Sequence, residues 1–125
     1  TVIMLIRYKK AMNKIAMGLL SFMPEHKEVK KLMDTMQFYD EHDDWKLYLW
    51  KKDDEYVGAI GVKVEDNTAV IQHITVIPSY RGEGVGTEMI SELCDLDDVE
   101  HISGIDEVQS FVQKCMKQIK EESTL

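Results

Sequence analysis

Three successive β-prone runs occupy the middle of the chain and predict an antiparallel meander of three strands. The first run, Trp45–Lys51, alternates, with Leu47 and Leu49 on one face. The second and third runs, Tyr56–Val64 and Thr68–Ile77, are strongly apolar and rich in β-branched residues, and the turn-like segment Glu-Asp-Asn joins them. Such runs, bounded by turn residues, are typical of strands.

Helical patterns flank this predicted meander on both sides. Apolar residues recur at a spacing of about three or four in four further segments, which is the period of an amphipathic helix. The predicted helices cover residues 10–22, 29–36, 85–93 and 108–119, and short strands are expected at residues 4–8 and 99–103. The resulting order, β-α-α-β-β-β-α-β-α, predicts an α+β or mixed α/β fold.

The length and composition of the chain limit its class. At 125 residues, the chain is expected to form one domain over residues 1–125. Met4 is the expected initiator, which makes residues 1–3 an added remnant or part of an alternative start. No apolar run approaches the roughly 20 residues that span a membrane, so no membrane partner is expected. Cys94 and Cys115 lack metal-type spacing and form no disulfide framework, so a reducing, cytoplasmic location is predicted.

The charge balance disfavours nucleic acid as a partner. The chain carries 23 acidic against 15 basic residues, a formal net charge of −8. Proteins that bind nucleic acid normally present a basic face, because neutralising phosphate supplies much of their affinity. The lysines near the N-terminus fall on predicted helices beside acidic residues, which is typical of a solvated helix face.

A cluster of glycines follows the third run of the meander. Three of the seven glycines lie within residues 82–86, directly after Arg81 and at the start of a predicted helix. The cluster is not a dinucleotide fingerprint, because Thr87 stands where that motif needs glycine, and it lacks the Gly-Lys pair of a Walker loop. Backbone N–H groups at a helix start form a concavity that binds anions, and glycines keep side chains out of it. The cluster therefore predicts a phosphate cradle.

The segment ITVIPSYRGEGVG (residues 74–86) resembles the acetyl-CoA-binding motif of the GNAT family of N-acetyltransferases. That motif reads Gln or Arg, two residues, Gly, one residue, and Gly or Ala. The order of elements from Met4 to Ile119 resembles the family too, and MLIRYKK, KIAMGLLSFMP and YVGAIGV are similar to a short form encoded with riboflavin-synthesis genes in some bacteria. The resemblance implies a GNAT-like, mostly antiparallel central sheet flanked by helices and short at its C-terminal end.

The resemblance also implies how acetyl-CoA binds as co-substrate, with no metal. The main chain of Ile74 to Val76 would run along the pantetheine arm, with the Ile74 N–H polarising the thioester carbonyl and Val76 holding the pantetheine amide. The N–H groups from Gly82 to Thr87 would cradle the pyrophosphate, and Arg81 would brace the loop or face the charge of the cofactor. The implied cofactor-binding residues are Ile74, Thr75, Val76, Arg81, Gly82, Glu83, Gly84, Val85, Gly86 and Thr87.

The two proton-transfer groups that are usual in the family are missing. Val70 stands where many relatives have a glutamate base, and Val112 stands where they have a tyrosine acid. His73 is the substitute candidate, because histidine titrates near neutral pH. Strict alternation would put Gln72 and Ile74 on one face and His73 on the other, unless a β-bulge, which is common there in this family, re-aims the imidazole. The alternative is a packed, hydrogen-bonded histidine.

The other candidate side chains predict structural roles. Cys115 lies on an apolar helix stripe, which favours a buried, inert thiol. His26, His42 and His101 are scattered and predict surface positions, so no metal site is expected.

Two function classes stay open. The first is an N-acetyltransferase that acts on an amine of a small molecule or a protein, and the second is an acyl-CoA-binding accessory module linked to riboflavin synthesis, with little or no turnover. The short C-terminal end leaves a bare strand edge, which favours a homodimer.

Overall fold

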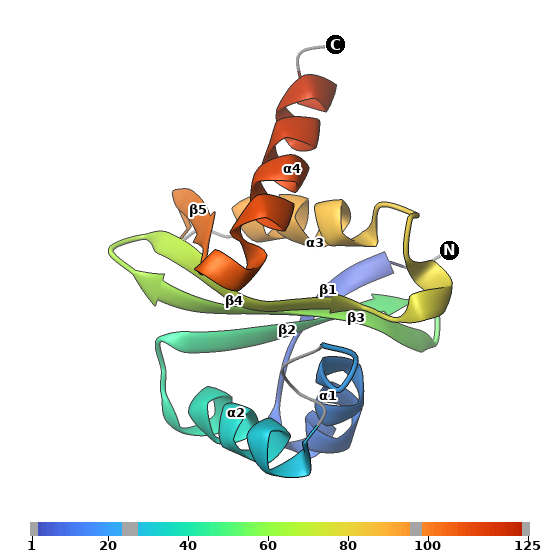
Figure 1. Cartoon of the computed structure of the whole chain (residues 1–125), viewed down its shortest axis with the longest axis vertical. Helices are drawn as coiled ribbons and strands as arrows, with labels where there is room; N and C mark the ends of the chain where they lie inside the picture. Colours follow the sequence, from blue (N-terminus) through green and yellow to red (C-terminus); the bar gives the residue numbers. More distant parts are fainter. Residues whose placement is uncertain (1–2, 24–27, 96–98, 124–125) are drawn as a thin grey trace.

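A five-stranded sheet runs through the centre of the protein (Figure 1). The structure is a computed structural model and describes residues 3–23, 28–95 and 99–123. The strands lie in the order β1-β2-β3-β4-β5, and every neighbouring pair is antiparallel except the parallel pair β4–β5. Their bounds are β1 Ile3–Arg7, β2 Trp45–Lys52, β3 Glu55–Glu65, β4 Thr68–Val76 and β5 His101–Gly104. The predicted meander is therefore confirmed, as is the mixed α/β class.

Helices cover both faces of the sheet, two on each (Figure 1). On one face lie α1 (Asn13–Leu20), which follows the 3-10 turn η1 (Lys10–Met12), and α2 (Val29–Glu41). On the other face lie α3 (Val85–Cys94), which follows the 3-10 turn η3 (Pro78–Tyr80), and α4 (Asp106–Ser123). None of the helices in the described part of the chain is long and apolar enough to cross a membrane.

The boundaries differ from the sequence pattern in places that have local causes. The predicted helix over residues 10–22 begins with η1 and its α-helical part ends at Leu20. Helix α2 continues past the last apolar residue of its stripe to Glu41. Strand β5 begins at His101 because the Asn67 carbonyl accepts the N–H groups of Glu100 (2.8 Å) and His101 (3.2 Å) and thereby fixes where pairing with β4 starts.

Each face of the sheet has its own hydrophobic cluster. The α1–α2 cluster consists of Tyr8, Ala16, Leu19, Leu20, Met23, Leu32, Met36, Tyr39, Leu47, Leu49 and Ala59. The α3–α4 cluster includes Tyr48, Trp50, Ile60, Ile71, Met89, Ile90, Leu93, Val112 and Cys115. Alternation along β2 places Leu47 and Leu49 in the first cluster and Tyr48 and Trp50 in the second, as the period of a strand requires. Burying each large apolar side chain contributes about 1.5–3 kcal/mol.

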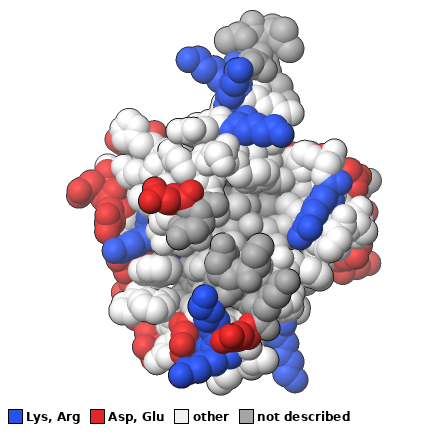
Figure 2. All heavy atoms as spheres, viewed as in Figure 1, with Lys and Arg blue, Asp and Glu red and all other residues white. Residues whose placement is uncertain are grey.

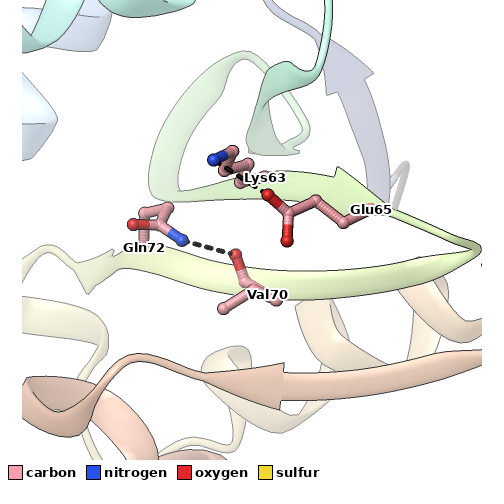
Figure 3. A network of polar contacts seen from close by, with 4 residues as sticks. All are labelled: Lys63, Glu65, Val70 and Gln72. Atoms are coloured by element: carbon pink, nitrogen blue, oxygen red, sulfur yellow. Dashed lines mark hydrogen bonds and ion pairs between the residues drawn. The ribbon is translucent and has the colours of Figure 1, made fainter.

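A β-bulge interrupts β4 beside the predicted catalytic position. Gly61 of β3 pairs with His73, but the next residue, Val62, pairs with Ile71, so Gln72 is the extra residue. The Gln72 amide folds back and donates a hydrogen bond to the Val70 carbonyl at 3.2 Å, next to the ion pair of Lys63 and Glu65 on β3 (Figure 3). The predicted bulge is present, but His73 and Ile74 still face opposite sides of the sheet, and His73 is hydrogen-bonded, as the alternative held.

The bulge decides which way the following side chains face. Ile71 belongs to the α3–α4 cluster, and Ile74 packs against the same cluster. His73 lies on the opposite face, where it contacts Tyr39 of the α1–α2 cluster. In an unbroken strand Ile71 and His73 would share a face, so the extra residue transfers the imidazole from one side of the sheet to the other.

Candidate active site

The outer edge of β4 is paired along only part of its length. Strand β5 pairs with Thr68 to Ile71 and then leaves the sheet. The Ile105 N–H still donates to the Ile71 carbonyl at 3.1 Å, whereas the Gly104 N–H donates to the side chain of Gln109 at 2.8 Å. Among the described residues, no strand pairs with the outer edge of β4 beyond Ile71.

The backbone groups that face this free edge follow from the pairing with β3. The Ile77 N–H donates to the Val57 carbonyl at 2.9 Å, so Ile77 directs its backbone groups toward β3. Because these directions alternate along a strand, Thr75 also faces β3, while Ile74 and Val76 face the free edge. The Arg81 Nε–H donates to the Val76 carbonyl at 3.1 Å, which fits this direction and braces the loop after β4.

A cavity of about 690 Å³ extends along the free edge to the glycine loop. Of the ten implied cofactor-binding residues, all except Glu83 line it. Eight further residues complete the lining, and most of them were not predicted from the sequence as site residues. They are Phe22, Met23, Tyr80, Val108, Phe111, Lys114, Cys115 and Gln118. Their α4 members recur at helical spacing, a pattern that predicted a buried stripe and gave no separate sign of a ligand site.

The three glycines of the loop serve two different purposes. Gly82 and Gly84 have φ values of +83° and +81°, in the left-handed region that residues with a Cβ rarely adopt. A Cβ at either position would meet nothing within 4 Å, so their need for glycine lies in the backbone conformation. Gly86 is different, because a Cβ there would press into the ring of Phe111 on α4. The loop thus turns sharply into α3 and lets α4 approach closely.

Positive charge and helix geometry favour an anion at this end of the cavity. Helix α3 begins at Val85, and its first turn directs N–H groups and the positive end of its dipole toward the loop. Arg81 and Lys114 supply two cationic side chains to the lining. Figure 2 shows basic side chains on the projecting end of α4 and acidic side chains along both flanks of the same view. An anionic ligand can therefore bind locally although the chain as a whole is acidic.

His73 is not among the described residues that line the cavity, and its side chain lies on the α1–α2 side of the sheet. Its Nδ1 is 2.6 Å from the Tyr39 hydroxyl, while its chain neighbour Ile74 lines the cavity. Burial raises the pKa of Tyr39 well above its ordinary value, so this phenol stays protonated. The imidazole therefore belongs to the residue that precedes the backbone N–H expected to face a thioester, and it lies on the opposite face of the sheet from the Ile74 side chain.

The remaining candidates lie where their patterns placed them or outside the described residues. Cys115 is buried and lines the cavity, whereas Cys94 is exposed. His42 and His101 are exposed, as predicted, and His26 lies outside the described residues. Within the described ranges, no group of three or more His, Cys, Asp or Glu side chains is placed to hold a metal ion.

A model of the Acetyltransferase (GNAT) family matches residues 14–115. The chain belongs to this family. It is 46% identical over 113 residues to an uncharacterized N-acetyltransferase in the lysA 3' region of Bacillus methanolicus, and the alignment covers 90% of this chain and 94% of that protein. The predicted link with riboflavin-synthesis genes stays a prediction.

Solved GNAT enzymes share the fold at low sequence identity. One is AAC(6')-Iy, in complex with the bisubstrate analogue CoA-S-monomethyl-acetylneamine, with a TM-score of 0.74, 11% identity, and coverage of 95% of this chain and 89% of that one. Another is the diaminobutyrate acetyltransferase EctA of Paenibacillus lautus, in complex with L-2,4-diaminobutyric acid and coenzyme A, with a TM-score of 0.71, 14% identity, and coverage of 99% and 78%. These similarities establish the GNAT architecture of the sheet and its helices.

The resemblance places two valines at the positions where the family usually has its acid and its base. Val112 is 2% exposed and belongs to the α3–α4 cluster. Val70 lies on β4 and pairs with Lys63. Neither side chain can exchange a proton.

Proposed function

We propose that this protein transfers the acetyl group of acetyl-CoA to an amine of a small molecule or a protein. The observation that carries the proposal is the single cavity that joins the free edge of β4 to the glycine loop and α3. A linear ligand with an amide-containing arm and a diphosphate matches these two ends. Family membership supports acyl transfer as the reaction class.

The residues of the cavity would divide the work of binding. Ile74 and the N–H of Val76, whose carbonyl already accepts from Arg81, would offer main-chain groups to the amides of the pantetheine arm, as an added strand does. The loop from Gly82 to Thr87 and the start of α3 would hold the diphosphate, with charge from Arg81 and Lys114. Gly82 and Gly84 fit this role because they leave open space at the loop, where a side chain would otherwise stand.

The transfer itself would need a carbonyl activator and a proton acceptor. The amine nitrogen attacks the thioester carbon, the bond from that carbon to sulfur breaks, the attacking nitrogen loses a proton and the sulfur takes one. The Ile74 N–H would polarise the carbonyl oxygen as charge develops on it. We propose His73 as the catalytic side chain that accepts the proton of the amine, a contribution of about 10²–10⁴ in rate.

An acyl-CoA-binding accessory module is the second candidate. The observation that favours it is the pair of valines, Val70 and Val112, at the usual catalytic positions. Such a module would bind acetyl-CoA through the same cavity and release no thiol with any acceptor. A link with riboflavin synthesis, a cytoplasmic location and a homodimer belong to the proposal on sequence grounds, and sedimentation velocity tests the homodimer.

Two measurements test the proposed function. Calorimetry with CoA and acetyl-CoA tests the cavity, and both ligands are expected to bind with one site per chain. A panel of small amines and lysine peptides, with thiol release as the readout, tests turnover. Tight binding without thiol release from any amine would favour the accessory module, and absence of binding would overturn both candidates.

A further inference from the structure

A tyrosine from α2 reaches across the sheet face to His73. The Tyr39 hydroxyl lies 2.6 Å from His73 Nδ1, and the two rings meet edge to face at 5.7 Å and 66°. Tyr39 is 7% exposed, and its ring packs edge-on against Trp45 at 5.6 Å. A short hydrogen bond between side chains held this firmly fixes the orientation of the imidazole.

Two features of the sheet bring these side chains together. The bulge at Gln72 turns His73 to the face that carries α2. Gly61, the register partner of His73, leaves the space that the Tyr39 hydroxyl occupies, because a Cβ on Gly61 would overlap that hydroxyl. Without the bulge the imidazole would lie on the other face, and without Gly61 the Tyr39 hydroxyl would lack room, so the pairing depends on both features.

We infer that Tyr39 is a positioning residue for His73, which fixes the orientation of the imidazole by holding Nδ1. This inference rests on the proposed function, in which His73 accepts a proton. Tyr39 would not touch the substrate, and it would act through the imidazole alone.

The hydrogen-bonding capacity of the hydroxyl suits both states of the imidazole. For Nε2 to accept a proton, neutral His73 must carry its hydrogen on Nδ1, and in that tautomer the Tyr39 oxygen would accept that hydrogen. When the amine gives up its proton, an N–H bond breaks on the amine and forms on Nε2, and Nδ1–H keeps its partner. The phenol stays neutral throughout, because burial raises the pKa of Tyr39. A charged imidazole away from bulk water needs such a partner.

The test is Tyr39→Phe, which removes the hydroxyl and keeps the ring. Two-bond ¹H–¹⁵N spectra at about pH 8, where an ordinary imidazole is neutral, should show the Nδ1–H tautomer of His73 in the wild type and a shift toward Nε2–H in the variant. With an accepted amine, kcat should fall by about 10- to 100-fold, with KM for acetyl-CoA unchanged. Tyr8→Phe is the matched control, because Tyr8 belongs to the same cluster but its hydroxyl accepts from Asn13 at 3.4 Å.

A double-mutant cycle separates positioning from general loss of structure. If Tyr39 acts through His73, then Tyr39→Phe should change kcat little in a His73→Gln background, since the shared function is already lost. Additive losses, or a wild-type His73 with its hydrogen on Nε2, would overturn the inference. If no amine releases thiol, the proposed function fails, whereas the tautomer comparison still decides whether Tyr39 holds Nδ1. If His73→Gln keeps full turnover, the catalytic part of the inference fails and the proposed CoA site stands.

Discussion

Gly61 and His73 face each other across β3 and β4, and the missing side chain of the first makes room for the partner of the second. The Tyr39 hydroxyl fills the space above Gly61 and reaches His73 Nδ1 at 2.6 Å. A glycine within a strand weakens the sheet locally. Gly61 has a packing role, because it makes room for Tyr39, and this role also supports the candidate functional residue His73.

Gly61→Ala should destabilise the fold, because the new methyl group would overlap the Tyr39 ring. We expect a loss of about 1–3 kcal/mol in the free energy of unfolding, as for other overpacked cores, measured by urea denaturation. Gly18→Ala in α1 is the matched control, since a Cβ there meets nothing within 4 Å and alanine favours helices by about 1 kcal/mol. Equal stability of Gly61→Ala and the wild type would contradict the packing described for Tyr39.

Gly84→Val should lower the affinity for CoA by at least about tenfold. The added Cβ would point into open space, so the effect should come from the φ of +81°, which a β-branched residue resists. Gly84→Asn separates the causes, because asparagine tolerates the left-handed region. Calorimetry should show that Gly84→Asn keeps part of the affinity for CoA and that Gly84→Val loses it. Unchanged affinity for CoA in a folded Gly84→Val protein would count against the phosphate cradle.

Lys114→Gln should weaken CoA binding about 3- to 10-fold, and more at low salt than at high salt, because exposed charges are screened. Lys114 lines the cavity, whereas Lys117 lies on the same helix and does not. Lys117→Gln is therefore the control and should leave the affinity near the wild-type value. Equal effects of the two substitutions would mean that α4 contributes only a diffuse field.

His73→Gln should cut turnover by about a hundredfold while the affinity for CoA stays near the wild-type value, since the cradle is untouched. In the wild type, turnover should rise with pH as the imidazole loses its proton. His101→Gln, an exposed histidine on β5, serves as the control. A folded His73→Gln protein with wild-type turnover between about pH 6 and 9 would leave Gln72, or water held by the main chain, as the route for the proton.

Tyr39→Phe should make the fold less sensitive to alkali. The pKa of Tyr39 is raised in the folded state by burial, so its stabilisation is complete below the unfolded-state pKa of about 10 and is lost as pH rises above it. Each further pH unit should cost the wild type up to about 1.4 kcal/mol from this group. Denaturation of both proteins between about pH 9 and 12 measures the difference, and parallel curves would show that Tyr39 titrates normally.

The sequence pointed to most of the residues at the end of β4 and in the glycine loop that line the cavity, but not to the contact between Tyr39 and His73. The glycine loop and the end of β4 are contiguous in the chain, so a local motif carries them. Tyr39 and His73 are 34 residues apart, and Tyr39 follows the last apolar residue of its predicted helix. Neither the helical spacing of apolar residues nor a local motif therefore indicated that they make contact. The pairing depends on a one-residue bulge and on a glycine in a third element, which act together only in the folded sheet.

The partly unpaired edge of β4 has a consequence for how this protein can change over evolutionary time. Contacts made by the main chain at Ile74 and Val76 are the same for almost any side chain, so substitutions there would leave the grip on the pantetheine arm intact. If the proposed binding mode holds, the side chains of Ile74 and Val76 are free of any role in holding the acyl donor. Valines at positions 70 and 112 are the kind of substitution that such a division of labour would permit.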